Sequence, residues 1–188
     1  MSVRLVLMRH GRTAWNVEGR YQGQADPPLD AHGRTQAVAL ALNLQRAGVR
    51  LDALYVSPLL RARQTALPVA ARLGVRPVYD PRWMEIHLGQ WQGLPVPVIR
   101  QRYPAAFARW EADPWGATIP GGEGLCQVQQ RVYAALDALR ARHVGQTVGV
   151  VAHHIPLALT KVRYQGLPAC QVRRIAVPNA RWEVVTVA

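Results

Sequence analysis

Imidazole, guanidinium and carboxyl side chains at separated points of this 188-residue sequence form a set that suits phosphoryl transfer. His10 can attack phosphorus when its attacking nitrogen is unprotonated and held in line with the leaving oxygen. Arg9 and Arg61 carry planar guanidinium groups that bind phosphoryl oxygens in pairs. His153 can donate to a phosphoryl oxygen, and Glu85 can protonate the departing oxygen and later accept a proton from water. This set predicts a covalent phosphohistidine mechanism, and nothing in it requires a metal or another cofactor.

Short apolar runs precede these side chains, as expected for strands that are buried on both faces of a parallel sheet. His10 follows the run 3–8, and His153 follows the run 147–151. Because ligands bind at the carboxyl ends of the strands in an open α/β sheet, we expect the side chains after the strands to meet at one edge. The other predicted strands are 53–56, 75–79, 173–177 and 181–187.

Helices are predicted between these strands from apolar positions at helical spacing and from residues that favour helix ends. Asp30 suits the N-cap of a helix that ends before Gly48. Ser57 and Pro58 suit the N-cap and the first position of a second helix, which ends before Gly74. Further helices are predicted at 99–112, at 124–142 and from about residue 156.

Strands that alternate with helices predict a three-layer α/β/α fold around a mostly parallel sheet. Only residues 178–180 separate the last two predicted strands, so we expect these strands to form a hairpin that makes one edge of the sheet antiparallel. No repeat, linker or change of composition divides the sequence. We therefore predict a single domain over residues 1–188, with residues 81–122 as a cap over the active face.

The sequence is strongly basic, with a formal net charge of +12 and a pI near 11.1. All basic residues except Lys161 are arginines, and they are spread from Arg4 to Arg181 rather than gathered in one run. This spread argues against a nucleic-acid-binding tail, whereas arginines suit phosphate and can steer anionic substrates to a cleft. The expected partner is therefore a small phosphorylated metabolite rather than nucleic acid.

Cys126 and Cys170 lie far apart and show no spacing typical of a metal site. No secretory signal pattern opens the sequence, and no apolar run has the length of a membrane span. These features predict a cytoplasmic protein with reduced thiols, no bound metal and no membrane partner. The oligomeric state stays open, with a homodimer as one alternative.

Five segments, in this order, resemble the motifs of the histidine phosphatase superfamily, which is also called phosphoglycerate mutase-like. The first is similar to the RHGxT signature, the second to the next phosphate-binding segment and the third to the segment that bears the acid. The fourth is similar to the strand end with the second histidine, and the fifth to the C-terminal turn. The likeness covers nearly the whole sequence. The segments are residues 9–13 together with Asn16, Gln22 and Gly23, then 57–66, 85–93, 151–153 and 179–180.

The resemblance implies a three-layer fold, a phosphatase activity and a role for each matching residue. His10 would be the nucleophile and Glu85 the proton donor. The phosphoryl group would lie among Arg9, Arg61 and His153. The remaining motif residues would bind the substrate from the other side of the pocket, partly through backbone amides; they are Thr13, Asn16, Gln22 and Gly23.

The sequence departs from the family pattern at two positions. His154 stands where the family usually has glycine, and because glycine tolerates a positive φ that histidine does not, we expect the backbone after His153 to be affected. His154 is also a candidate for an additional contact to the substrate. Gly124 replaces the usual serine and is expected to cap the following helix weakly.

Several other residues are alternatives for these roles. Asp26, Asp80 and Glu111 are alternatives to Glu85 as the acid, although Asp26 and Asp80 precede prolines and suit turns. A further group could contact the substrate or belong to ordinary packing, namely Arg20, Trp83, His87 and Trp91.

The segment between Glu85 and Gly122 is short, whereas the phosphoglycerate mutases resembled here usually carry an insertion after the acid motif. This difference favours a phosphatase that hydrolyses a small phosphomonoester. Two alternatives stay open: a phosphoglycerate mutase, and a non-catalytic protein that binds phosphoanions or nucleic acid. A non-catalytic binding protein would not need His10 and Glu85 together.

Overall fold

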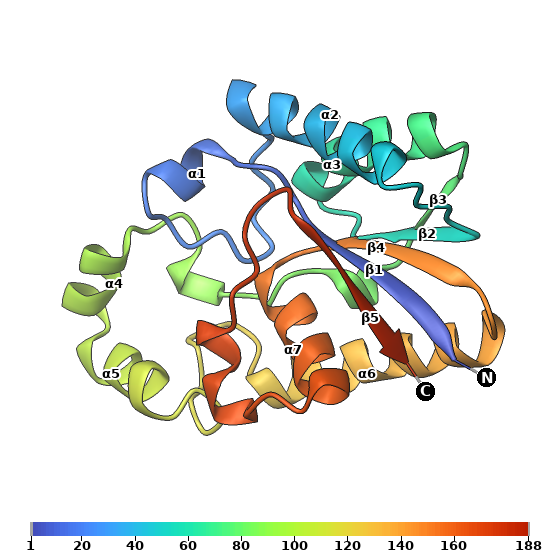
Figure 1. The fold of residues 1–188 in the computed structure, drawn as a ribbon. Helices are drawn as coiled ribbons and strands as arrows, with labels where there is room; N and C mark the ends of the chain where they lie inside the picture. Colours follow the sequence, from blue (N-terminus) through green and yellow to red (C-terminus); the bar gives the residue numbers. More distant parts are fainter. Residues whose placement is uncertain (1, 188) are drawn as a thin grey trace.

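A five-stranded sheet organises residues 2–187, the part of the chain that the computed structural model describes (Figure 1). Its strands are β1 Val3–Arg9, β2 Ala53–Val56, β3 Pro77–Tyr79, β4 Thr147–Ala152 and β5 Trp182–Val187. They follow the order β3-β2-β4-β1-β5, in which all neighbours are parallel except β5, which runs antiparallel to β1. The predicted mostly parallel sheet with one antiparallel edge is therefore confirmed.

Helices cover both faces of this sheet, as predicted for a three-layer fold. They are α2 Ala31–Arg46, α3 Leu60–Leu73, α6 Leu125–Arg142 and α7 His154–Gln165. Figure 1 shows α2 and α3 above the sheet and α6 and α7 below it. Side chains of β1 alternate between the two layers, with Leu5 and Leu7 in one core and Val6 and Met8 in the other. None of the helices within residues 2–187 has the length and apolar surface to cross a bilayer.

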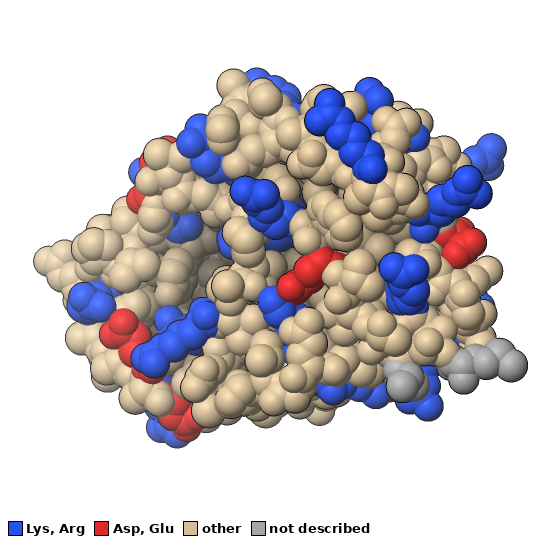
Figure 2. Space-filling model, viewed as in Figure 1, with Lys and Arg blue, Asp and Glu red and all other residues tan. Residues whose placement is uncertain are grey.

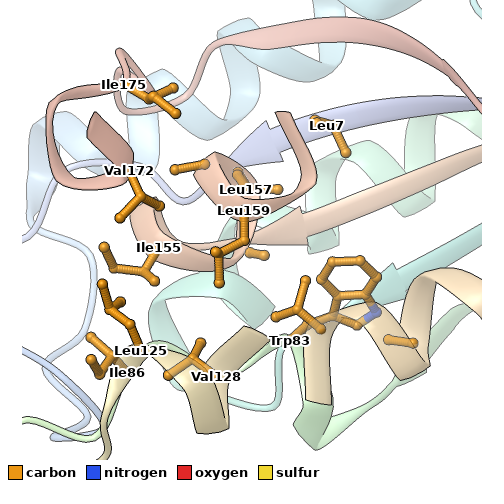
Figure 3. Close-up of a cluster of buried hydrophobic side chains, with 14 of the residues drawn as sticks. Leu7, Trp83, Ile86, Leu125, Val128, Ile155, Leu157, Leu159, Val172 and Ile175 are labelled. Carbon is orange, nitrogen blue, oxygen red and sulfur yellow. The ribbon is translucent and has the colours of Figure 1, made fainter. Parts of the chain in front are cut away.

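The larger hydrophobic core lies between the sheet and the layer of α6 and α7. Figure 3 shows side chains of this core from several elements, among them Trp83, Val128 of α6 and Leu159 of α7. Trp83 and Trp91 are both completely buried in this core. These two candidates for substrate contact are therefore packing residues.

Residues 81–122 lie mainly in short helices near α1 Ala14–Val17, a helix that the sequence patterns did not predict (Figure 1). The helix predicted over 99–112 is confirmed except at Tyr103, which divides it into two helices. Tyr103 has φ −130° and ψ 53°, outside the helical region, because the proline that follows it disfavours helical backbone. The short helices are η1 Pro81–Trp83, η2 Gly89–Trp91, α4 Val96–Arg102 and α5 Pro104–Ala112.

The predicted strand 173–177 and its hairpin are wrong. This part of the chain begins in a 3-10 helix, η3 Ala169–Arg174. Val172 and Ile175 are buried in the same core as α7, and this packing fixes the segment against the helix. The antiparallel edge therefore arises because β5 pairs directly with β1, not with a neighbour in sequence.

Three element starts differ from the prediction. α3 begins at Leu60, three residues after the proposed cap Ser57, which is completely buried and contacts the site described below. α7 begins at His154 rather than near Pro156. β3 begins at Pro77, so the third strand is shorter than predicted. The first two shifts affect the site. Ser57 lies before α3 instead of capping it, and His154 lies inside the first turn of α7.

Gly33, in the first turn of α2, packs against the backbone of Arg12, and we expect Gly33→Ala to be destabilising. A Cβ atom at this position would overlap the Arg12 carbonyl. The free energy of unfolding should fall by about 1–3 kcal/mol, although alanine ordinarily favours a helix over glycine. Urea unfolding measures this change, with the exposed His32→Ala in the same turn as control. A Gly33→Ala variant as stable as the unchanged protein would contradict the tight contact.

Candidate active site

A cavity of about 370 Å³ lies at the carboxyl end of the sheet, where the segments after β1, β2 and β4 meet. Figure 2 shows this face hollowed between α1 and η3, with Lys and Arg side chains beside the hollow. Of the residues predicted for the site, His153 and Thr13 do not line the cavity. Those that line it are Arg9, His10, Asn16, Gln22, Gly23, Arg61, Glu85 and His154.

His10 follows β1 and is held by the adjacent backbone. Its Nδ1 lies 2.7 Å from the Gly11 carbonyl oxygen, which can only accept a hydrogen bond. Nδ1 therefore carries the ring proton, and the lone pair lies on Nε2. Burial lowers the pKa of His10 well below its ordinary value of 6.5, and the charges of Arg61 and Arg9 lower it further. At neutral pH His10 is a neutral imidazole whose Nε2 is available for attack.

His153 lies beside His10, with the two ring centroids 5.1 Å apart. Its Nε2 is 2.7 Å from Ser57 Oγ, and this oxygen already accepts from the backbone N–H of Leu59. When the Ser57 hydroxyl donates to Nε2, the ring proton of His153 is on Nδ1. Nδ1 is buried and has no partner in the structure. Burial lowers the pKa of His153 well below 6.5, followed by the effect of Arg61, so this ring is a neutral donor.

Arg61, in the first turn of α3, is a buried cation that is only 1% exposed. Its Nη2 donates to the Gly23 carbonyl at 2.7 Å and its Nη1 to the Ala25 carbonyl at 2.8 Å. Burial lowers the pKa of Arg61 to about 10. Its Nε is buried without a partner. Because backbone carbonyls hold the guanidinium and leave other N–H groups unused, Arg61 is prepared to bind an anion.

Arg9 ends β1, and the C-terminal turn of the chain holds this strand end in place. Arg9 Nη1 donates to the Val177 carbonyl at 2.6 Å, and the backbone N–H of Ala180 donates to the Arg9 carbonyl at 3.1 Å. Asn179 Nδ2 donates to the His10 carbonyl at 2.9 Å. Ala180 has φ 50°, in the left-handed region, so the turn is tight. Residues 177–180 therefore orient both the arginine and the histidine.

Glu85 presents its carboxylate to the cavity from the segment after η1. Its Oε1 accepts from the backbone N–H of Ile86 at 3.0 Å and from that of Ile155 at 3.2 Å. Ile155 lies in the first turn of α7, so the carboxylate sits at the positive end of a helix. With Oε1 held in this way, Oε2 is the oxygen left for a substrate or a water molecule.

An ion pair that the sequence patterns did not predict fixes the backbone of Glu85. Arg131 of α6 binds the Glu123 carboxylate at 3.0 Å through both Nε and Nη2. It also donates to the carbonyls of Met84 at 2.6 Å and Glu85 at 3.0 Å. Glu123 in turn accepts from the backbone N–H of His87 at 2.7 Å. Arg131 is therefore a positioning residue for the segment that carries the acid.

Thr13 shapes the loop after His10 instead of lining the cavity. It is the N-cap of α1, where its Oγ1 accepts from the Asn16 N–H at 3.2 Å. Asn16 Oδ1 accepts from the Thr13 N–H at 3.0 Å, which completes a capping box. The start of the same loop is anchored by Gly11, whose N–H donates to Thr65 Oγ1 at 2.9 Å. These bonds place Asn16 at the cavity and use its Oδ1 for the loop.

Gly23 makes the turn that supports Arg61. It has φ +53°, and a Cβ atom there would lie 2.5 Å from Gln92 Oε1. Both facts require glycine at this position. Gln22, next to it, lines the cavity, and its Oε1 is buried without a partner.

His154 lies in the first turn of α7, where the backbone is helical. Within residues 2–187, Ala180 is the one non-glycine residue with a positive φ, so the expected disturbance after His153 does not occur. His154 lines the cavity, and its Nε2 is buried without a partner. Burial lowers the pKa of His154.

Gly124, the second departure from the family pattern, is the N-cap of α6 and offers no side-chain oxygen. Gln127 compensates in part, because its Oε1 accepts from the Gly124 N–H at 2.8 Å. The weak cap therefore leaves a defined helix start.

The alternatives to Glu85 lie outside the cavity. Asp26 accepts from the Leu60 N–H at 2.6 Å, and Asp80 pairs with Arg82 at 2.7 Å. Glu111 pairs with an arginine on the surface. Across residues 2–187, histidine, cysteine and acidic side chains nowhere form a group of three that could hold a metal ion.

Many residues that line the cavity were not predicted from the sequence. Arg20, which was a candidate for substrate contact, lines the cavity, and His87 does not. Trp15 and Tyr21 could have been found because they lie within the loop that follows His10. Trp110 and Arg173 could not, since no motif or spacing in the sequence places them near the residues that follow the strands. The residues missed are Trp15, Gly19, Tyr21, Ile86, Leu88, Val96, Trp110, Ile155 and Arg173.

Comparison with known proteins gives matches over nearly the whole chain. The model of the family described as "Histidine phosphatase superfamily (branch 1)" matches residues 5–188. Phosphoserine phosphatase 1 of Hydrogenobacter thermophilus is 37% identical over 97% of this chain and 86% of that protein. A "Probable phosphoglycerate mutase GpmB" of Yersinia pestis is 32% identical over 94% of this chain and 81% of that protein.

Solved structures give the same result. The alpha-ribazole phosphatase of Shigella flexneri superposes with a TM-score of 0.87 at 30% identity, over 98% of this chain and 94% of that chain. A mycobacterial glucosyl-3-phosphoglycerate phosphatase, solved in complex with VO3, superposes with a TM-score of 0.83 at 36% identity, over 96% of this chain and 91% of that chain. The structural similarity therefore includes phosphatases whose names state different substrates.

The two buried histidines predict that stability falls with acid. His10 and His153 have pKa values well below 6.5 in the folded protein, whereas the unfolded chain takes up protons near 6.5. Their contribution is therefore complete above about pH 6.5 and is lost as the pH falls toward their folded pKa values. Each can contribute up to about 1.4 kcal/mol per pH unit in this window.

Urea unfolding of His153→Gln between about pH 7.5 and about pH 5.5 tests this assignment. The variant should lose less stability over this range than the unchanged protein, because one of the two buried imidazoles is absent. The exposed His32→Gln serves as control and should follow the unchanged protein. An equal slope for His153→Gln and the unchanged protein would rule out the buried neutral state of His153.

Proposed function

This chain is a phosphatase of the histidine phosphatase superfamily, branch 1, and we propose that it hydrolyses small phosphomonoesters through a phosphohistidine on Nε2 of His10. The observation that carries this proposal is the state of His10. Its Nδ1–H is held by the Gly11 carbonyl at 2.7 Å, and burial together with the charges of Arg61 and Arg9 lowers its pKa, so the ring is neutral. A buried structural histidine needs neither neighbouring arginines nor a cavity.

In this mechanism Arg9, Arg61 and His153 bind the phosphoryl group. Both arginines have a buried Nε without a protein partner, and so does Nδ1 of His153. These unused donors can bind the equatorial oxygens of a phosphoryl group, where negative charge is spread in the transition state. An anion in this position would satisfy all three groups at once.

The first chemical step forms the covalent intermediate. The lone pair on His10 Nε2 attacks phosphorus, an N–P bond forms and the bond from phosphorus to the ester oxygen breaks. Glu85, in its protonated form, gives its proton to that oxygen, and the alcohol leaves. The Gly11 carbonyl stabilises the positive charge that develops on the ring, since it accepts from Nδ1–H throughout.

The second step returns the enzyme to its starting state. Glu85 is now ionised and accepts a proton from a water molecule, whose oxygen attacks phosphorus. The N–P bond breaks, the electron pair returns to His10 Nε2, and inorganic phosphate leaves. The backbone contacts of Glu85 to Ile86 and Ile155 hold the carboxylate in one place for both proton transfers.

The expected substrate is a small phosphorylated metabolite, which suits a cavity of about 370 Å³. The net charge of +12 can raise the rate at which such anions reach the cavity. On the face shown in Figure 2, Lys and Arg side chains are scattered and some lie beside the hollow. This arrangement supports steering of small anions better than a continuous nucleic-acid surface.

Loss of the nucleophile should abolish turnover. We expect His10→Ala to lower kcat for p-nitrophenyl phosphate by at least about a thousandfold, because no other imidazole can form the intermediate in line. Colorimetric release of nitrophenol and phosphate in the presence of EDTA measures this effect. His32→Ala, on the exposed side of α2, is the matched control and should keep full activity.

Two results would contradict this proposal. Activity of the unchanged protein that disappears in EDTA would exclude a mechanism without a metal. Isomerisation of 3-phosphoglycerate without net release of phosphate would identify a mutase instead.

Glu85→Gln should affect substrates according to their leaving group. Glutamine keeps an oxygen for the N–H groups of Ile86 and Ile155 but cannot donate a carboxylic proton. Alkyl phosphates should therefore lose about 10²- to 10⁴-fold in kcat, and p-nitrophenyl phosphate much less, since nitrophenolate leaves without a proton. Steady-state kinetics with both substrates measures the difference, with Glu111→Gln as a surface control. Equal losses on both substrates would remove Glu85 as the acid.

A further inference from the structure

Arg173 is a cation on the cavity wall that the phosphoryl mechanism does not use. It lies in η3, and its Nη1 donates to the Trp110 carbonyl at 2.7 Å. Its guanidinium carbon lies 4.7 Å from the centroid of the Trp110 ring, so the side chain is stacked on the indole. Trp110 is 2% exposed and lines the same cavity. The guanidinium is therefore held rigidly, with most of its N–H groups unused.

The other arginines of the cavity are already committed. Arg9 and Arg61 line the cavity together with His10 and are proposed to bind the phosphoryl group. Arg20 forms an ion pair with Glu18 and donates to the Gly93 carbonyl at 2.9 Å. Arg173 forms no ion pair with any carboxylate among residues 2–187. It is therefore the cation of the cavity that is free to bind a second negative group.

His154 connects this arginine with the phosphoryl end of the cavity. Burial lowers the pKa of His154, the Glu85 carboxylate opposes this shift, and the charges of Arg9 and Arg173 add to it. His154 lines the cavity, and its Nε2 is buried without a partner. Arg9, His154 and Arg173 all line the cavity and form its polar wall, and His154 is the residue that replaces the usual glycine of the family.

Part of the lining is apolar, which sets the kind of group that Arg173 would bind. Apolar side chains give no hydrogen bonds to a polar substrate body, so recognition depends on the few polar groups. The guanidinium fork matches a carboxylate with two parallel hydrogen bonds. The apolar side chains are Ile86, Leu88, Val96 and Ile155.

We propose that Arg173, with His154 beside it, forms a subsite for a carboxylate, so that the preferred substrates are small phosphomonoesters that also carry a carboxylate. This inference rests on the proposed phosphatase function and adds the feature of the substrate that is recognised. In this arrangement the phosphate is bound at His10 and the carboxylate at Arg173.

Substrate pairs that differ at the carboxylate test the subsite directly. O-phosphoserine is compared with O-phosphoethanolamine, and 3-phosphoglycerate with glycerol 3-phosphate. A charge-assisted hydrogen bond predicts that kcat/KM is about tenfold to a hundredfold higher for the carboxylated member of at least one pair. Arg173→Gln should reduce this preference to near unity, and Arg173→Lys should keep part of it.

Arg174→Gln is the matched control, because Arg174 is exposed, lies next to Arg173 and is outside the cavity. It removes the same charge and should keep the preference. Each variant's rate with p-nitrophenyl phosphate, which has no carboxylate, separates a loss of the subsite from a loss of the fold. A preference that survives Arg173→Gln, or activity on p-nitrophenyl phosphate without preference in either pair, would overturn the subsite. Failure to hydrolyse p-nitrophenyl phosphate would instead overturn the phosphatase function.

Discussion

The hydrogen bonds of the buried Arg61 guanidinium to the carbonyls of Gly23 and Ala25 are the interaction on which the rest of the site depends. A guanidinium that is 1% exposed is costly unless its donors are satisfied, and two carbonyls satisfy only part of them. The remaining donors make the cavity a site for an anion. Burial lowers the pKa of His10 and of His153, and the charge of Arg61 lowers both further, so in the proposed mechanism Arg61 attracts the phosphoryl group and helps to keep the nucleophile unprotonated.

Nucleophile and acid are held by different means. His10 stands at the end of β1, which lies between β4 and β5, and the turn at Asn179 fixes its backbone. Glu85 lies on an irregular segment, where no strand or helix can define its place. Arg131 and the first turn of α7 replace that support with hydrogen bonds to its backbone carbonyl and its carboxylate. A group that transfers protons twice needs such fixed contacts as much as the attacking nitrogen does.

The central fold could be predicted from the sequence because its strands are continuous apolar runs and its long helices have clear periodicity. Predictions failed where tertiary contacts decide the conformation. Ser57 has the residue type of a helix cap, yet its hydroxyl faces His153, and the helix begins three residues later. Residues 173–177 include the short apolar run 175–177, but Val172 and Ile175 are buried in the same core as α7, and β5 takes the place beside β1. Local propensity could not reveal either outcome.

The site likewise has one part that local sequence patterns predict and another that depends on tertiary contacts. The proposed phosphoryl half consists of residues at the ends of strands or in the segments that follow them, so a short motif contains each of them together with its position. The other half joins Trp110 to Arg173, which are 63 residues apart and meet only after α5 and η3 have packed. No spacing in the sequence relates these two residues, and the strand predicted for the segment of Arg173 was wrong. The residues proposed to bind the phosphate can therefore be identified from short motifs, whereas Arg173, the proposed contact to the rest of the substrate, reaches the cavity only because distant segments pack together.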